Sequence, residues 1–554
     1  MPAAASMRPG FRAENNHWRE QHLTRLPRHV TSALRERVEQ IDVTDYRAAN
    51  TYLGETVTRL TAAHLHRAYD EQLIRDYGDN YARLCGRSPS LEKRRDFALA
   101  MGIEPPAGRS ISPAGMAARL ECPRWWRAQL RKSWTRAAEN SMRELGFIRR
   151  GRAPYASNEA VDHRRAQKRR AVDFMQSFVA VNETTGEQLS LWDAHEHSIS
   201  NPALRRGEFM CRARGFELIA KDMGHVAEFV TLTAPSAFHA QLAAAGANPA
   251  FQRQAVRDAQ AWLCKMWARA RAKLKRLSIL FYGFRIAEPH HDATPHWHLL
   301  LFLPTSAADS LRAVLRGFWL SELSGEAGAT EHRCKFERID AAKGSATGYV
   351  AKYVSKNIDG KGAIANERDH ESGTGVAEGI ERVETWASVH GIRQFQQIGG
   401  PQVTLWREAR RLRNRVDDPD IEVARQCADS GRWREFVQCV GGIHAGRRTN
   451  LKLLKVETGE RDRYGDCKPA RVIGLQWASA IVVTHPDRWR IEKKSESERR
   501  CAICGAPWVL GHRCKPTIGL SSFDSYLGPV SITVRDQAAR VRFDGTREQS
   551  QGDP

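Results

Sequence analysis

Residues 278–303, SILFYGFRIAEPHHDATPHWHLLLFL, contain two β-rich runs, SILFYGFRI and HWHLLLFL, joined by the polar segment PHHDATP. The proline, aspartate and threonine of that segment are typical of a turn between antiparallel strands. In the second run, His296 and His298 are two residues apart, so both imidazoles project from the same face of a strand. The stretch therefore predicts a β-hairpin that carries a pair of histidines on one face.

Strands and helices alternate on both sides of this hairpin. Before it, EFVTLT (228–233) is β-rich and residues 251–277 carry apolar residues at helical spacing. After it, the pattern predicts a helix around 307–323, a short strand near 334–339 and a helix from about 345 to 357. The order strand, helix, strand, strand, helix, strand is the split β-α-β arrangement, which has helices on one face. We therefore expect an α+β fold whose second sheet face is free for a ligand.

The histidine pair is a candidate metal site. Two imidazoles and a carboxylate hold a divalent ion and leave positions open for phosphate oxygens and water. Glu288, at the end of the preceding strand, is the nearest carboxylate across the turn. His290, His291 and Asp292 are alternatives, because the sequence does not give the strand register. A lone His-x-His pair is also common as a structural or solvent-facing feature, so the metal site needs a second motif beside it.

The second motif is GYVAKYVSK (348–356). On a helix, Tyr349 and Tyr353 lie on one face, and Lys352 and Lys356 form a neighbouring pair. A tyrosine hydroxyl has an ordinary pKa near ~10, so positive charge from a metal and these lysines is needed to stabilise a nucleophilic phenolate. The alternative is an amphipathic helix with half-buried tyrosines. Beside the histidine pair, the motif predicts tyrosine attack on a phosphodiester, leaving a 5′-phosphotyrosine and a free 3′-hydroxyl.

Composition points to a nucleic-acid partner. The chain has 554 residues with 86 Lys and Arg against 64 Asp and Glu, a formal charge of +22, which is typical of proteins that bind a polyanion. It has no long apolar run and no apolar signal-peptide core, so we expect a cytoplasmic protein with reduced thiols. It also has no G-x-x-x-x-G-K-[ST] loop, so strand opening is expected to need a separate helicase.

In these motifs the chain resembles the HUH endonucleases, and among them the replication gene A proteins of tailed temperate phages and their prophages. The resemblance lies in FVTLTAP (229–235), RIAEPHHDATPHWHLLLF (285–302) and GYVAKYVSKN (348–357), and GGPQVTLWREARRLR (399–413) is also similar. It implies that His296 and His298 bind Mg²⁺ or Mn²⁺ and that Tyr349 and Tyr353 are alternating nucleophiles. The implied activity is a site-specific single-strand nickase that initiates rolling-circle replication in a bacterial host and rejoins strands at termination.

The resemblance also implies partners: supercoiled and single-stranded origin DNA, a host helicase and a host polymerase. Thr231 and Thr233 fall in the first motif and are expected to position DNA or support the sheet.

Two other functions stay open. A non-enzymatic single-stranded nucleic-acid-binding protein is expected to present stacking aromatics on the open sheet face. An HUH relaxase or transposase would share the same chemistry. A hydrolytic zinc enzyme would have no use for the tyrosines.

We predict that the HUH endonuclease domain, with its antiparallel sheet, occupies residues 206–360. A basic, mainly helical region (1–205) precedes it. A Gly-rich flexible linker (361–385), a basic C-terminal region (386–520) and a polar tail (521–554) follow it.

Two further features lie outside the central motifs. Trp125 and Trp126, among arginines, belong either to a helix core or to a platform for unpaired bases. Near the C-terminus a C-x₂-C-x₇-H-x-C pattern over 501–514 is a candidate structural zinc knuckle, with free thiols as the alternative. Its ligands would be Cys501, Cys504, His512 and Cys514.

Overall fold

The computed structural model describes residues 9–26, 28–62, 68–242, 246–323, 325–326, 328–340, 344–357 and 375–494. The chain divides into two compact units, residues 1–492 and 493–554, and all but the last two described residues belong to the first. Within these described ranges, no helix has both the length and the apolar character of a membrane span.

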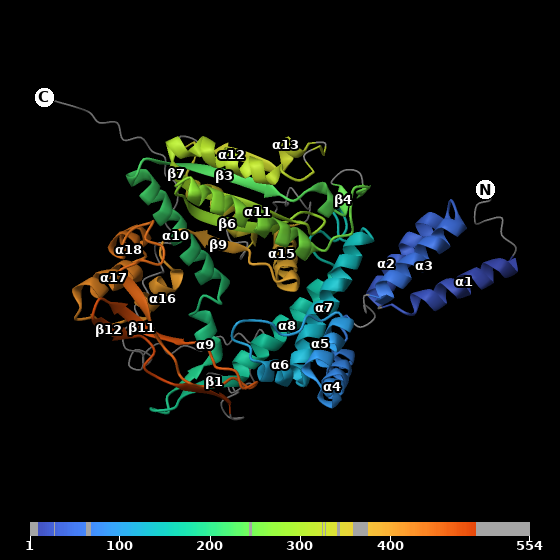
Figure 1. Cartoon of the computed structure of the whole chain (residues 1–554), viewed down its shortest axis with the longest axis horizontal. Helices are drawn as coiled ribbons and strands as arrows, with labels where there is room; N and C mark the ends of the chain where they lie inside the picture. The colour runs from blue at the N-terminus through green and yellow to red at the C-terminus, as the bar shows by residue number, and fades with distance from the viewer. Residues whose placement is uncertain are drawn as a thin grey trace, which may run out of the picture. The chain divides into compact units, whose positions relative to one another are not determined.

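A five-stranded antiparallel sheet forms the centre of the first unit (Figure 1). Its strands are β3 (His225–Thr233), β6 (Tyr282–Pro289), β7 (Pro295–Pro304), β8 (Cys334–Arg338) and β9 (Phe395–Ile398), in the spatial order β8-β3-β7-β6-β9. Helix α11 (Val256–Arg276) connects β3 to β6, and α12 (Ala308–Trp319) lies between β7 and β8. The predicted α+β class is confirmed, whereas β9, which pairs with β6, was not predicted.

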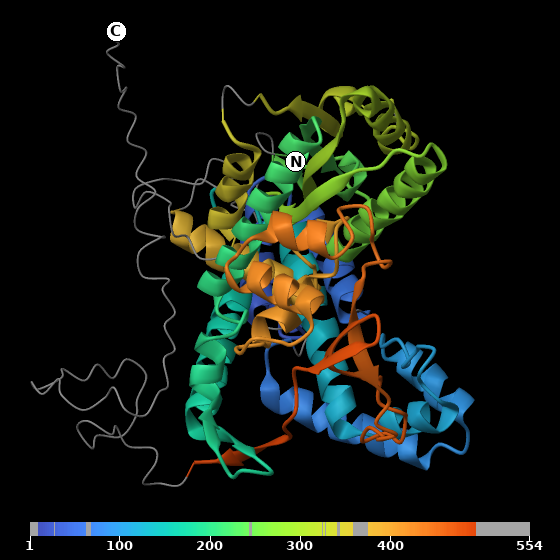
Figure 2. The ribbon, with the colours of Figure 1, turned by 90° about the vertical axis from the view of Figure 1, so that its left-hand side faces the viewer.

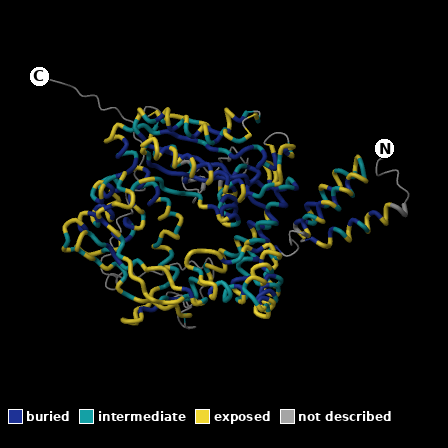
Figure 3. Tube along the Cα trace, viewed as in Figure 1, coloured by how far each residue is buried: buried dark blue, intermediate teal, exposed yellow. Residues whose placement is uncertain are grey.

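Each face of the sheet packs into its own hydrophobic core. On one face, Leu232, Trp297 and Leu299 are buried against α11 and α12. On the other, Phe284 and Leu300 pack with α10 (Pro202–Asp222) and α14 (Ala346–Asn357). Strands β6 and β7 are buried along almost their whole length (Figure 3). The expectation of a free second face was therefore wrong, because the aromatic and aliphatic side chains on that face pack against helices and are buried.

The cover of the second face includes helices from after the sheet. These helices are α16 (Val403–Arg411), α17 (Pro419–Asp429) and α18 (Trp433–Cys439), and Figure 2 shows α10 beside them. The ring of Phe216 on α10 lies 6.0 Å from that of Trp433 on α18. Hence the segment that carries GGPQVTLWREARRLR contributes to the core behind the sheet.

Helices make up most of the described chain before the sheet. They are α1 (Pro9–Leu23), α2 (Arg28–Asp42), α3 (Tyr46–Ala62), α4 (Glu71–Arg87), α5 (Leu91–Ala100), α6 (Pro113–Leu120), α7 (Pro123–Glu144), α8 (Asn158–Ser177) and α9 (Leu191–Glu196), with the short strands β1 (Phe178–Asn182) and β2 (Gln188–Ser190). Trp126 is fully buried and its indole nitrogen donates to the Leu120 carbonyl over 2.7 Å. Trp125 is buried beside it. The tryptophan pair thus belongs to the helix core.

The predicted linker over 361–385 is too long at its C-terminal end. Residues 376–385 form the first turns of α15 (Val376–His390). The helix is held because Val383 and Trp386 are buried, and because the Trp386 indole nitrogen donates to the Ala293 carbonyl over 2.9 Å. The predicted boundary at 205 falls inside α10, and β9 joins the central sheet from beyond the predicted boundary at 360. The boundary at 520 lies outside the described residues and stays a prediction.

The remaining elements are short. They are η3 (Ser236–Phe238), β4 (Gln241–Leu242), β5 (Gly246–Ala247), η4 (Thr305–Ala307), α13 (Ala329–His332), β10 (Leu451–Val456), β11 (Arg471–Trp477), β12 (Ala480–Val483) and β13 (Trp489–Lys493). Strands β10, β11 and β12 form one antiparallel sheet, and β13 joins β1 and β2 in another.

Candidate functional site

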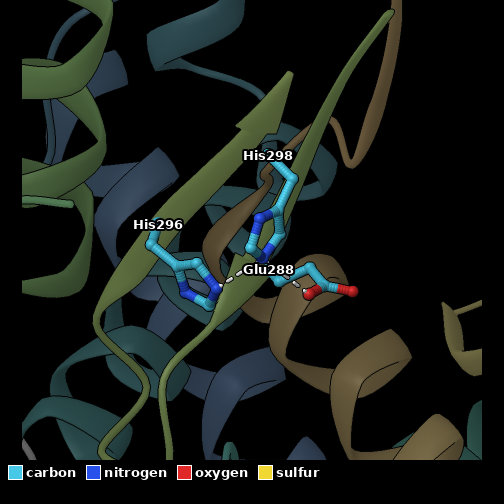
Figure 4. A group of neighbouring side chains, drawn as sticks. All are labelled: Glu288, His296 and His298. Carbon is cyan, nitrogen blue, oxygen red and sulfur yellow. Dashed lines mark hydrogen bonds and ion pairs between the residues drawn. The ribbon is translucent and has the colours of Figure 1, made fainter. Parts of the chain in front are cut away.

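Three side chains converge at one end of β6 and β7 (Figure 4). Glu288 pairs directly opposite His296, and His298 follows two residues along the same strand. The Nε2 atoms of His296 and His298 are 2.9 Å apart, and Glu288 Oε2 lies 3.3 Å from His298 Nε2. All three residues are buried, and one ligand atom from each lies within 4.8 Å of the others. We call them the His–His–Glu cluster.

The geometry of the cluster fits a divalent ion. Neighbouring ligands of an octahedral ion with bonds of about 2.1 Å lie about 3 Å apart. The distances of 2.9 Å and 3.3 Å between the ligand atoms match this spacing. Two imidazole nitrogens and one carboxylate oxygen would occupy one side of such an ion, which leaves its other positions for phosphate oxygens and water.

The strand register favours Glu288 over the other acidic or histidine candidates. His290 stacks its ring on His296 at 4.0 Å between centroids, outside the cluster. His291 accepts a hydrogen bond from the backbone of Tyr155 at its own carbonyl. Asp292 is fully buried in the turn and accepts from the backbone nitrogens of Ala240 (2.8 Å) and Thr294 (3.0 Å). The turn residues therefore shape the hairpin and do not join the cluster.

Asp292 is locked by an arginine from the N-terminal helices. Arg143 of α7 is 1% exposed and donates to the Asp292 carbonyl (2.8 Å), the Gln254 carbonyl (2.9 Å) and Thr294 Oγ1 (2.7 Å). Burial raises the pKa of Asp292, but the charges of His239 and Arg143 outweigh it and hold that pKa well below its usual value. Helix α7 thus fixes the turn that leads into the cluster.

We expect Arg143→Ala to lower the free energy of unfolding by about 3–5 kcal/mol. The change removes one of the two charged partners of the buried Asp292, and it leaves the acceptors of Arg143 at Asp292, Gln254 and Thr294 without that donor. Urea unfolding followed by circular dichroism measures this loss. Arg149→Ala is the control, since Arg149 is exposed in the same part of the chain. A loss no larger than that of the control would show that Arg143 does not hold the turn.

A threonine of β3 supports the cluster. Thr231 pairs opposite His298, and its Oγ1 lies 3.1 Å from His298 Nδ1. A hydrogen bond at one ring nitrogen fixes the orientation of the imidazole and aims the other nitrogen at a metal. Thr231 therefore acts on the histidine, in line with the expected supporting role of the first motif.

Thr231→Val should weaken Mn²⁺ binding about tenfold, because loss of an outer partner frees the ligand ring while the side-chain volume is kept. Calorimetric titration with Mn²⁺ gives the affinity. Thr58→Val, at an exposed position of α3, is the matched control. Equal Mn²⁺ affinity in the Thr231 variant and wild type would remove Thr231 from the site.

The tyrosine helix lies beside the cluster. The ring of Tyr353 on α14 is 4.5 Å from that of His298, and the rings of Tyr353 and Tyr349 lie 5.2 Å and 5.9 Å from that of Phe229 on β3. Tyr349 Oη donates to Glu337 Oε1 over 2.7 Å, and this hydrogen bond raises the pKa of Tyr349. The two tyrosines thus share one face of α14 but have different partners.

Sequence reasoning missed Phe229 and Glu337. Phe229 stands two residues before Thr231 on β3, so strand alternation was a signal for its position. Glu337 becomes a partner only through packing of β8 beside α14. The side chains of Lys352 and Lys356 lie outside the described residues, although their backbone belongs to α14. The candidate zinc ligands Cys501, Cys504, His512 and Cys514 also lie outside the described residues.

Fold and site together define a class of protein. Its members have an α+β fold with an antiparallel sheet, and a buried His–His–Glu cluster lies beside a helix that carries two tyrosines. Residues 97–361 match the family model described as bacteriophage replication gene A protein (GPA). This part of the chain therefore belongs to the bacteriophage replication gene A protein family.

Curated relatives agree with the family match. The "Replication gene A protein" of Escherichia phage 186 is 38% identical over 72% of this chain and 58% of its own length. The "Replication protein" of Haemophilus phage HP1 is 36% identical over 72% and 53%. A "Probable replication endonuclease from prophage-like region" of Salmonella typhimurium is 35% identical over 76% and 53%. The chain thus spans little more than half the length of these relatives, and no solved structure matches it.

Proposed function

We propose that the chain is a metal-dependent endonuclease that nicks one strand of replication-origin DNA and holds the new 5′ end on a tyrosine. The observation that carries this proposal is the position of the Tyr353 ring, 4.5 Å from His298 of the His–His–Glu cluster. The printed names of the prophage relatives, which include replication endonuclease, support a nuclease.

In the proposed step, a tyrosine Oη attacks the scissile phosphorus and the bond from phosphorus to the 3′ oxygen breaks. The phenol loses its proton, the 3′ oxygen gains one, and the products are a 5′-phosphotyrosyl bond and a free 3′-hydroxyl. Mg²⁺ or Mn²⁺ held by Glu288, His296 and His298 would polarise the phosphate as a Lewis acid. One phosphodiester replaces another, so a second tyrosine can repeat the exchange and rejoin strands at termination.

The two tyrosines have different places in this scheme. We assign the first attack to Tyr353, whose ring contacts His298. Tyr349 donates to Glu337, whose carboxylate is within hydrogen-bond reach to take the phenolic proton in the second exchange. Lys352 and Lys356 remain proposed as the positive charges that stabilise the phenolates.

The wider proposal is rolling-circle replication from a specific origin, with a host helicase opening the duplex and a host polymerase extending the 3′-hydroxyl. A non-enzymatic binding protein is disfavoured, because α10 and α14 cover the sheet face that such a protein would use for stacking. Relaxases and transposases of the same chemistry would differ in substrate.

The test is a denaturing gel of the full chain mixed with labelled supercoiled and single-stranded DNA from its own replicon, with and without Mn²⁺. We expect a metal-dependent band in which protein and DNA stay joined after boiling. DNA that is bound but never captured or cut, across overlapping fragments of the replicon, would overturn the nickase in favour of a binding protein.

A further inference from the structure

A second feature lies beside the cluster: a cavity of about 340 Å³ at the end of the sheet where β3 stops. In Figure 1, α13 and β4 lie at this end. Its lining includes Thr233, His239, His290 and His332, together with Arg150, which follows α7 in the chain. We call this cavity the His239 pocket.

The pocket and the cluster share a wall. His290 lines the pocket and stacks on His296 at 4.0 Å between ring centroids, and the His239 ring lies 5.0 Å from that of His290. Thr233, also in the lining, pairs directly opposite His296. A molecule in the pocket is therefore separated from the cluster by about one side chain, a spacing that suits the next unit of a chain whose phosphate lies at the cluster.

The lining suits a nucleotide. Imidazole rings present flat surfaces on which unpaired bases stack. Arg333 is paired with Glu326, so among the charged side chains that line the pocket Arg150 is left to face a phosphate. Pockets for small ligands commonly have about 300–1,000 Å³. At about 340 Å³ the His239 pocket takes one nucleotide and is too small for a base pair.

We propose that the His239 pocket binds one unpaired nucleotide of the DNA strand, adjacent to the phosphate that lies at the His–His–Glu cluster. The proposal rests on the proposed function for the identity of that phosphate. A base in the pocket has to leave its stack, so the pocket makes the site selective for single-stranded or melted DNA and sets the register of the strand at the cluster.

The first test measures binding in the presence of EDTA, which separates it from cleavage. The probes are a short fluorescent oligothymidylate and a duplex of equal length, followed by anisotropy. Leu242→Trp narrows the mouth of the pocket from an exposed position, and Arg150→Ala removes its charge. Leu280→Trp, also exposed, and Arg269→Ala, on an exposed position of α11, are the matched controls.

Leu242→Trp should bind the oligothymidylate about tenfold more weakly than wild type, the usual effect of losing one stacked base. Arg150→Ala should also weaken this binding, because it removes the positive charge that faces the phosphate. Duplex binding and both controls should stay at the wild-type level. Oligothymidylate binding equal to wild type in Leu242→Trp, or an equal loss in the controls, would overturn the proposal.

The second test uses the strand that the chain cuts, with one abasic nucleotide moved step by step along it. An abasic nucleotide next to the cut phosphate should weaken binding of the strand to the wild-type protein. The same abasic nucleotide should leave binding of the strand to the Leu242→Trp variant unchanged. If the oligothymidylate result is as expected and no DNA is ever cut, the nucleotide-binding proposal is supported and the proposed nickase activity is wrong. If DNA is cut and no abasic position distinguishes the two proteins, the nucleotide-binding proposal is wrong and the nickase activity is supported.

Discussion

Replacing Tyr349 and Tyr353 together by phenylalanine is expected to reduce covalent capture of DNA by at least about a thousandfold, the scale seen when a nucleophile is removed. Phenylalanine keeps the ring packing against Phe229 and His298 but removes both hydroxyls. DNA binding should therefore remain at the wild-type level. Denaturing gels measure capture, and anisotropy in EDTA measures binding.

The single variants separate the two tyrosines. Tyr353→Phe should lose most of the first cleavage, whereas Tyr349→Phe should still cut short single-stranded substrates and lose the second exchange. Tyr464→Phe, far from the cluster in the chain, is the control. Capture that persists in the double variant would mean that another residue is the nucleophile.

The second large effect is expected at the cluster. His296→Ala removes one of the three ligands, and we expect cleavage at limiting Mn²⁺ to fall by about a hundredfold or more. Glu288→Gln should act in the same direction, because it keeps the side-chain volume and removes the negative charge. Cleavage rates across a series of Mn²⁺ concentrations, with EDTA as the zero point, measure the effect.

His197→Ala, at an exposed position, is the control for loss of a histidine. If high Mn²⁺ restores cleavage by His296→Ala, the variant binds the ion more weakly than wild type. Unchanged cleavage by His296→Ala at limiting Mn²⁺ would contradict the metal assignment.

Local pattern was enough to predict the elements that build the hairpin. Strand alternation placed His296 and His298 on one face, and the polar turn was a sufficient signal for antiparallel pairing. Strand β9 could not be predicted in the same way, because its four residues, Phe395–Ile398, form a strand only by pairing with β6. The start of α15 follows a glycine-rich segment whose composition favours a loop, and the helix is held by burial of Val383 and Trp386.

The candidate site was predictable as far as it depends on neighbours in sequence. Glu288 was one of several candidates until the register placed it opposite His296. The contact of Arg143 with the turn could not be predicted, because Arg143 lies 149 residues before Asp292 and contacts the turn only through the packing of α7. The Glu337 partner of Tyr349 likewise depends on how β8 and α14 pack, which no periodicity encodes.

The most direct measurement is to digest the boiled protein–DNA adduct with nuclease and trypsin and locate the nucleotide by mass spectrometry. Trypsin separates the two tyrosines, since residues 344–352 carry Tyr349 and residues 353–356 carry Tyr353. We expect a 5′-linked nucleotide on 353–356 after the first cleavage and on 344–352 only when a second exchange is allowed. A nucleotide on any other peptide, or nicked DNA with no adduct at all, would contradict a tyrosine-linked mechanism.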